Sequence, residues 1–199
     1  MATIRMLGLD PSLTHTGYVV VEVHAGTRQI VRTLEMGTIV TAPSKNKKVR
    51  KSSDALERAR LVKNTIGDVI SEHGIKIASS EVPSGAQSAN ACYAFGIVVG
   101  LLASLPIPII EVSPREVKMA TAGTATADKE DIVRWAVEKT AQDDIKWNTS
   151  KHPNDWEIPH NGGFVTKTME HQADALAGVQ AAITSEQFRQ LSGMMLALI

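Results

Sequence analysis

The chain has 199 residues, of which 43% are hydrophobic, and its 21 basic and 21 acidic residues give a formal net charge of zero. This hydrophobic content can bury one sizeable core, while the zero charge excludes a global positive field, so any polyanion must be held by local basic patches. Cys92 is the only cysteine, which excludes an intramolecular disulfide, and no signal peptide or membrane-length apolar run is evident. We therefore expect one cytoplasmic domain over residues 1–199, with no membrane partner.

The first forty residues have the pattern of a strand meander. Three β-branched or alternating runs, "TIRMLGLD", "TGYVVVEV" and "QIVRTLEMGTIV", are separated by turn residues and predict three consecutive antiparallel strands. Apolar residues at helical spacing then predict a helix over 54–73 with Asp54 as its cap, and "GIKIASSE" predicts a fourth strand. A helix between two strands implies a crossover connection.

The second half of the chain is mainly helical. The apolar stretch 87–104 is rich in Ala and Gly and predicts a buried helix, in which Cys92 would be a small buried residue, and "PIPIIEV" predicts a fifth strand. Further helices are expected at about 113–121, 127–141, 166–183 and 185–197. This order predicts an α/β fold with a five-stranded mixed sheet and helices on both faces.

Two connecting segments stand out by length or charge. A loop at about 41–53 carries five basic residues within seven positions, Lys45, Lys47, Lys48, Arg50 and Lys51. Such a run is either a solvated surface loop or a local contact for a polyanion. A second loop, at about 142–165, is unusually long for a compact domain and holds two of the three tryptophans, Trp147 and Trp156.

Carboxylates end two of the predicted strands. Asp10 and Glu81 each follow an apolar run and precede a turn, and His171 and Asp174 lie three residues apart on one helix face. If the strands are neighbours and the helix packs over their ends, these side chains converge, and their mutual repulsion calls for a cation. Carboxylate oxygens with one imidazole suit Mg²⁺ or Mn²⁺, so the pattern predicts a divalent-metal site.

Each of these residues has a plainer interpretation when taken alone. An Asp after a strand commonly forms a turn with its own backbone, as the sequence "DPS" at Asp10 allows. His171 near a helix start can be an ordinary surface histidine. The joint placement on three elements in a consistent order is what favours the metal site.

Four sequence blocks resemble those of the RuvC-type Holliday junction resolvases: "GLDPSLTHTGYVVVE", "SSEVPSGAQSANACYAFGIVVGLL", "PIIEVSPREVKMATAGTATADKEDI" and "EHQADALAGVQAAI". Together they span most of the chain from Leu7 to Ile183. The first block carries the Asp-Pro-x-x-x-x-Thr-Gly turn of that family, and the last carries its His/Asp-x-x-Asp-Ala-Leu-Ala. The third is the most diagnostic, with the pattern Pro-x-x-Val-Lys, Gly and Ala-x-Lys met by Pro114, Val117, Lys118, Gly123, Ala127 and Lys129.

The resemblance implies a ribonuclease H-like fold and a homodimer that nicks symmetry-related strands of four-way DNA junctions, in the cytoplasm of a bacterium or a phage-infected host. It implies two Mg²⁺ ions per active site, with Mn²⁺ as a substitute, held by Asp10, Glu81, His171 and Asp174. Lys118 would act beside them in catalysis. The implied DNA-contacting residues are Lys118, Lys129, Arg115 and the five cations of the 41–53 loop.

The chain departs from the family pattern after Glu81. The family usually places an aromatic residue there to stack at the opened crossover, whereas this chain has Val82, Pro83, Ser84 and Gly85. Trp147 and Trp156 are candidates for that role, with anchoring of their own loop as the alternative. The nuclease interpretation also has an alternative: a ribonuclease H-fold enzyme acting on flaps, forks or RNA–DNA hybrids.

Other function classes fit less well. An actin-like sugar kinase or ATPase would need a second Gly-rich phosphate loop and two such domains, and this chain is too short for them. A non-catalytic binding module would tolerate loss of a carboxylate, and none is lost here. For assembly, Gly96 and Gly100 lie one helical turn apart and predict either close packing of two copies or packing on the chain's own sheet.

Overall fold

A mixed five-stranded sheet forms the centre of the computed structural model, which describes residues 2–85, 87–151 and 155–197. The strand order is β3-β2-β1-β4-β5. β1 (Thr3–Asp10), β2 (His15–His24) and β3 (Gln29–Val40) pair antiparallel, as the meander pattern predicts. β4 (Ile77–Ser80) and β5 (Ile109–Glu111) add to β1 in parallel, because helical crossovers precede both. The predicted mixed sheet is therefore confirmed.

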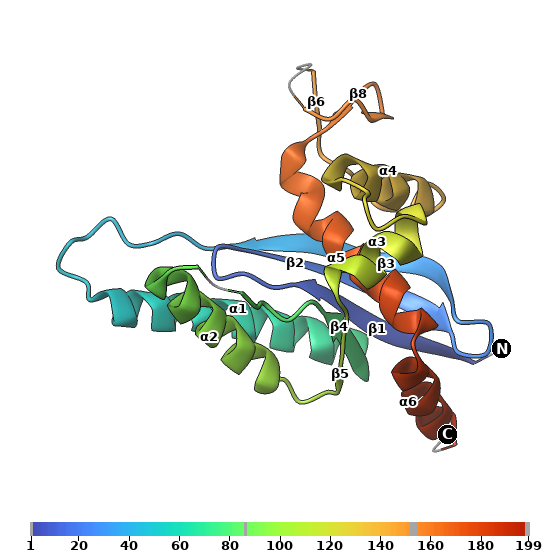
Figure 1. The fold of residues 1–199 in the computed structure, drawn as a ribbon, viewed down its shortest axis with the longest axis horizontal. Coiled ribbons are helices and arrows are strands. Elements are labelled where there is room, and N and C mark those ends of the chain that lie inside the picture. The colour runs from blue at the N-terminus through green and yellow to red at the C-terminus, as the bar shows by residue number, and fades with distance from the viewer. Residues whose placement is uncertain (1, 86, 152–154, 198–199) are drawn as a thin grey trace.

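Helices cover both faces of this sheet, as expected (Figure 1). α1 (Lys51–His73) and α2 (Ala89–Ala103) pack on one face, where Leu7, Leu9 and Val20 point toward them. The other face carries α3 (Pro114–Ala122), α4 (Lys129–Lys139), α5 (Glu170–Thr184) and α6 (Glu186–Leu196). Val19 and Val21 belong to this second core while Val20 belongs to the first, because side chains alternate along a strand.

α5 lies unusually close to the two central strands, and two glycines make this possible. A Cβ at Gly8 of β1 would collide with the carbonyl oxygen of Ala175, and a Cβ at Gly17 of β2 would collide with the backbone of His171. The helix contributes mainly small side chains to this contact, and from Ala173 to Ile183 only Asp174 and Gln180 are not buried. The helix backbone can therefore rest directly on the sheet.

The start of α1 differs from the predicted one. The helix begins at Lys51 rather than at residue 54, and its N-cap is Arg50, which makes no side-chain cap bond. Asp54 lies in the first turn instead, where Oδ1 accepts a hydrogen bond from the backbone N–H of Ser44 at 2.8 Å. Asp54 is thus not the cap of the helix. Its role is to secure the preceding loop to the first turn of α1. That loop covers residues 41–50, and Lys51 belongs to α1.

The segment predicted as a long loop at about 142–165 contains regular structure. β6 (Thr149–Ser150), β7 (Pro159–His160) and β8 (Gly163–Val165) form a three-stranded sheet in the order β6-β8-β7, which lies beyond α4 and the start of α5 in Figure 1. The strands are only two or three residues long, too short to show an alternating pattern. A 3₁₀ turn, η1 (Lys167–Met169), then leads into α5, which starts later than the expected residue 166.

α2 is not buried on all sides, contrary to the prediction for residues 87–104. Val98 is buried against the sheet, whereas Tyr93 is 51% exposed and Val99 is 41% exposed. Cys92 is also exposed, so the expectation of a buried cysteine is wrong. The composition is apolar on both faces of this helix, so hydropathy alone could not distinguish a buried helix from one with an open apolar face. Within the described residues, no helix is long and apolar enough to cross a membrane.

The contact between α5 and β1 leads to a stability prediction. Gly8→Ala should lower the free energy of unfolding by about 1–3 kcal/mol, and the melting temperature by roughly 2–10 °C, because the added methyl group meets the backbone of Ala175. Gly67→Ala is the matched control, since Gly67 lies within α1 and an added Cβ there has no neighbour within 4 Å. That variant should be as stable as the wild type or slightly more stable. Equal melting temperatures for the Gly8 variant and the wild type would contradict this view of the contact.

Candidate active site

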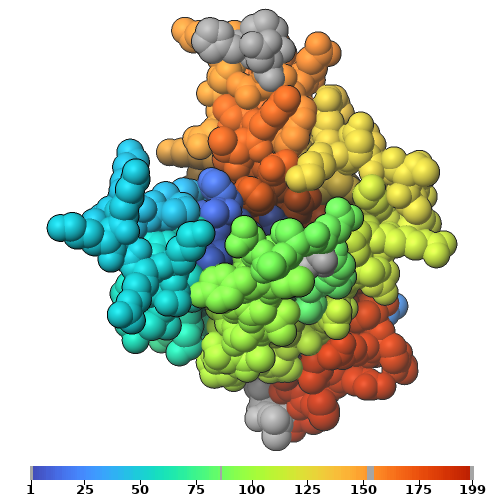
Figure 2. Space-filling model, turned by 60° about the vertical axis from the view of Figure 1, so that its left-hand side comes forward, coloured from blue at the N-terminus to red at the C-terminus, as the bar shows by residue number. Residues whose placement is uncertain are grey.

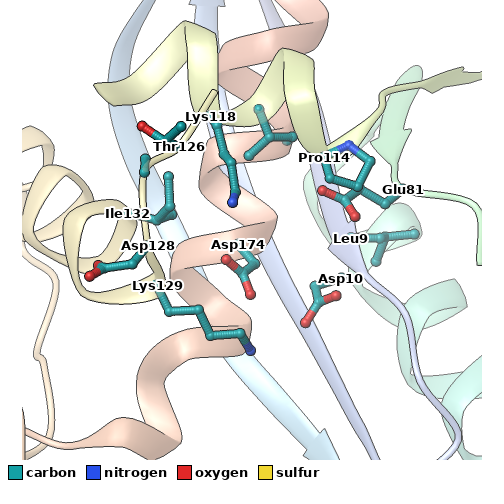
Figure 3. Close-up of a pocket in the computed structure, with 13 residues that line it drawn as sticks. Leu9, Asp10, Glu81, Pro114, Lys118, Thr126, Asp128, Lys129, Ile132 and Asp174 are labelled. Carbon is teal, nitrogen blue, oxygen red and sulfur yellow. The ribbon is translucent and has the colours of Figure 1, made fainter. Parts of the chain in front are cut away.

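Three of the predicted carboxylates line one pocket. β1 and β4 are parallel, and Leu9 pairs with Ser80, so the next residues along each strand, Asp10 and Glu81, emerge at the same edge of the sheet. α5 crosses that edge and brings in Asp174. The pocket has a volume of about 540 Å³, and its lining includes all three carboxylates together with Lys118 and Lys129, as Figure 3 shows.

His171 lies next to this pocket rather than in its lining. Its Nδ1 is 2.7 Å from Oδ2 of Asp10, a hydrogen-bonding distance across two distant parts of the chain. The imidazole of His15 stacks on that of His171, with ring centroids 5.5 Å apart and planes 10° from parallel. His15 is the first residue of β2, so the hairpin that follows Asp10 also supports the histidine beside it.

The carboxyl groups repel one another. Burial raises the pKa of Asp174 to about 7, and the negative charge of Asp10 adds to this effect. Burial and Asp10 also raise the pKa of Glu81, although Lys118 and Lys129 act in the opposite direction. The hydrogen bond to Asp10 raises the pKa of His171, because the carboxylate stabilises the imidazolium. The pocket therefore holds more negative charge than its own side chains neutralise.

An additional carboxylate, Glu170, was missed in the sequence analysis. Its Oε2 is 2.9 Å from Nζ of Lys129, and its Oε1 is 3.8 Å from Nε2 of His171. Burial lowers the pKa of Lys129, but the hydrogen bond to Glu170 and the negative charges of Glu170, Asp174 and Asp10 together outweigh it and raise that pKa. The available signal was an acidic residue directly before His171, but its partner, 41 residues away, is identified only by the fold.

The basic residues predicted to contact DNA lie in different places. Lys118 of α3 and Lys129 of α4 reach the pocket. Arg115 is exposed on α3 and is not part of that lining. The five cations of residues 45–51 are also exposed, on the segment that leads into α1. Their roles remain predictions.

The two tryptophans of the 142–165 segment serve as anchors. Trp147 is 4% exposed, and its Nε1 donates a 3.0 Å hydrogen bond to Oγ1 of Thr140 at the end of α4. Trp156 is half-buried and packs against the core on the α5 side of the sheet. The anchoring alternative is thus the correct one for Trp147, because a buried indole cannot reach a DNA base.

The donor set suits a divalent cation by its chemistry, since carboxylate oxygens predominate and their charge is in excess. Among the described residues, no three side chains of the types His, Cys, Asp and Glu are close enough together to hold a metal ion as they stand. A bound cation would therefore require small rotations that bring the carboxylates of Asp10, Glu81 and Asp174 together.

Comparison with known proteins places this arrangement in a family. The family model described as "Crossover junction endodeoxyribonuclease RuvC" matches residues 6–142. The protein of that name from Synechococcus sp. (strain CC9605) is 30% identical over 138 residues, covering 65% of this chain and 79% of that protein. Its counterpart from Synechococcus sp. (strain CC9311) is 27% identical over 158 residues, covering 76% of this chain and 91% of that protein.

Solved structures show the same fold. T. thermophilus RuvC in complex with a Holliday junction substrate superposes with a TM-score of 0.64 at 22% identity, covering 89% of this chain and 92% of that one. The yeast mitochondrial Holliday junction resolvase Ydc2 superposes with a TM-score of 0.61 at 10% identity, covering 98% of this chain and 82% of that one. These likenesses confirm the ribonuclease H-like fold. Since the family model spans most of the chain, the protein belongs to the RuvC family of crossover junction endodeoxyribonucleases.

Proposed function

We propose that this chain acts as one nuclease domain that nicks symmetry-related strands of four-way DNA junctions in a divalent-metal-dependent reaction. The observation that carries the proposal is the pocket in which Asp10, Glu81 and Asp174 meet Lys118 and Lys129 in a member of the RuvC family. The junction-bound structure of T. thermophilus RuvC supports the choice of substrate. Such DNA lies in the cytoplasm of a bacterium or a phage-infected cell, where we expect the enzyme to act.

The residues that would hold two Mg²⁺ ions, or Mn²⁺ in their place, are Asp10, Glu81, His171 and Asp174. When bound, such ions lower the pKa of an attacking water and stabilise the leaving 3′-oxygen. Asp10 has a second task in the free protein, where its Oδ2 is hydrogen-bonded to Nδ1 of His171. Either atom would have to give up this hydrogen bond to ligate an ion.

The two lysines act on the phosphate. Lys118 and Lys129 border the carboxylates from α3 and α4, so a phosphodiester in the pocket meets positive charge on the side away from β1 (Figure 3). Glu170 holds the ammonium of Lys129 at 2.9 Å and therefore orients it in the absence of DNA. Fixed charges of this kind stabilise a developing negative charge without reorganising during the reaction.

A homodimer would provide the two active sites that two symmetric nicks require. α2 offers a suitable surface, since Tyr93 and Val99 are exposed and added Cβ atoms at Gly96 and Gly100 would have no neighbour within 4 Å. An apolar face with small residues allows two helix backbones to approach closely. We propose that two copies pair through this face of α2.

The first test is the substitution Asp10→Asn. It should reduce cleavage of a four-way junction with Mg²⁺ by about a hundredfold or more, because an anionic ligand is lost while the shape is kept. Junction binding should be unchanged or tighter, since less negative charge faces the phosphates. The matched control is Asp68→Asn on the exposed side of α1, which should cleave like the wild type.

Measuring the wild type on four-way junctions, flaps, forks and RNA–DNA hybrids in the same assay tests the choice of substrate. Preferential cleavage of the four-way junction supports the proposal. A faster reaction on flaps, forks or hybrids would favour the alternative nuclease function, and full activity of the Asp10 variant would exclude the metal site.

The basic segment leads to a prediction on salt dependence. Replacing Lys45, Lys47, Lys48, Arg50 and Lys51 with Ser should weaken binding to all DNA sequences alike. The slope of log K against log salt should decrease by roughly 0.9 for each phosphate that the variant no longer neutralises. Lys63→Ser is the control, because Lys63 is exposed on α1 outside this segment. An unchanged slope would remove the segment from the DNA-binding surface.

Asp174 leads to a prediction on stability in EDTA. Its folded-state pKa of about 7 lies above the usual 3.8, so the folded chain binds more protons than the unfolded chain between these values. Stability therefore falls as pH rises through this window. Asp174→Asn removes this loss and should raise the melting temperature by roughly 5 °C or more at pH 8 and by less than half as much at pH 5.

The control for the pH experiment is again Asp68→Asn, whose melting temperature should differ from that of the wild type by the same small amount at both pH values. Parallel melting curves for Asp174→Asn and the wild type across this range would show that Asp174 ionises without a penalty.

A further inference from the structure

A second cavity lies on the other side of the turn that follows Asp10. Its volume is about 300 Å³. One wall is the turn itself, residues 11–14, and another comes from α2 through Ala94, Phe95 and Val98. Pro83 and the side chain of Arg58 complete it. We call this cavity the turn pocket.

The turn pocket is continuous with the active site through the backbone. Pro11 directly follows Asp10, and Pro83 comes two residues after Glu81, so the same two strand ends supply carboxylates to one cavity and proline rings to the other. In Figure 2 the blue atoms of the first strands lie at the bottom of a hollow, with the cyan segment that leads into α1 on one side and green α2 on another. A DNA strand with a phosphate at the carboxylates would therefore pass its neighbouring nucleotide over the turn pocket.

The chemistry of the turn pocket suits a flat, partly polar ring. Phe95 and the two prolines provide carbon surfaces, while the hydroxyl residues Ser12 and Thr14 lie in the turn. Stacking on such surfaces tolerates any base, because every base has a π-face. A phosphate would need several converging donors, whereas among the described residues Arg58 is the one cation in this lining.

Arg58 is held in place to serve this cavity. Its side chain is only 13% exposed, its Nε donates to Oγ1 of Thr41 at 2.8 Å, and its Nη2 donates to the carbonyl oxygen of Leu13 at 2.9 Å. The nearest carboxylate oxygen, Oδ2 of Asp54, is 3.7 Å from Nη1. A guanidinium fixed in this way lines the turn pocket and loses little further side-chain entropy when a ligand binds.

We propose that the turn pocket binds an unpaired nucleobase of the DNA substrate, from a nucleotide adjacent to the cleaved phosphate. The proposal rests on the proposed function, because it requires DNA in the neighbouring active site. Nucleotides at a branch point lack a continuous stack on one side, so extruding one of them costs less than in an uninterrupted duplex. The turn pocket thereby favours branched DNA and occupies the role left open by the residues after Glu81.

The first arm of the experiment uses the wild-type protein alone. Binding to four-way junctions is measured by fluorescence anisotropy in EDTA, with a single abasic site moved through the nucleotides around the branch point. One position should weaken binding by about tenfold, because a stacked base is missing there. Uniform affinity across all abasic positions would overturn the turn-pocket proposal without any protein variant.

The second arm fills the cavity. Ala94→Leu places a larger side chain in the lining, on a helix that tolerates leucine. The control Ala141→Leu makes the same change at an exposed position after α4, outside the turn pocket and outside the face of α2 proposed for pairing. The Ala94 variant should bind the intact junction about tenfold more weakly than the wild type, while the Ala141 variant binds as the wild type does. Melting curves verify that both variants are folded.

Testing the Ala94 variant on the abasic junction shows whether the sensitive base and the turn pocket interact with each other. If the base sits in the turn pocket, Ala94→Leu should cause no further loss on the junction whose sensitive nucleotide is abasic. Independent, additive losses would overturn the proposal, as would wild-type affinity of a folded Ala94 variant. A wild-type protein that binds four-way junctions no better than linear duplex would instead contradict the proposed function, so the two failures are distinguishable.

Discussion

The contact between the backbone of α5 and the glycines of β1 and β2 determines the geometry of the whole active site. At Gly8 and Gly17 the helix lies where a Cβ atom would otherwise be, against the carbonyl groups of Ala175 and His171. Because the helix backbone lies this close to the two strands, Nδ1 of His171 can reach Oδ2 of Asp10 at 2.7 Å. A helix separated from the sheet by ordinary side chains would carry His171 and Asp174 farther from β1 and leave the strand-end carboxylates without them.

The same closeness has an electrostatic cost. Asp174 is brought into a region poor in water beside Asp10, which raises its pKa to about 7, and the pKa of Glu81 rises for the same reasons. The small residues of α5 that allow the approach offer no compensating charge. The interactions that hold the helix down must therefore offset this repulsion, and they come from the apolar core below, which includes Leu176, Val179 and Ile183. A cation that neutralises the pocket would remove this repulsion, which the apolar packing offsets in the free protein.

Elements with a strong local pattern were predictable from the sequence, whereas contacts between side chains that are far apart in the sequence were not. The strands before Asp10 and Glu81 alternate or run apolar, so their existence follows from pattern. Their pairing as neighbours, which brings the two carboxylates to one edge, was only a condition of the metal-site hypothesis, and the structure shows that it is met. The bond between Glu170 and Lys129 joins residues 41 apart through the packing of α4 on α5, which no local signal encodes. Trp147 was ambiguous for the same reason, since its packing in the core and its hydrogen bond to Thr140 are set by the fold and not by a local pattern.

The turn after Asp10 connects the two cavities physically. Thr16 and Ser12 close the turn, since Oγ1 of Thr16 donates to the carbonyl oxygen of Ser12 at 2.5 Å and Arg58 binds the carbonyl oxygen of Leu13 at 2.9 Å. The turn therefore has little freedom to move independently of α1. A ligand that presses on it from the turn pocket would act on the position of Asp10, because only Pro11 separates that carboxylate from the bonded segment. Recognition of branched DNA and placement of the catalytic carboxylate would then depend on the same short stretch of backbone.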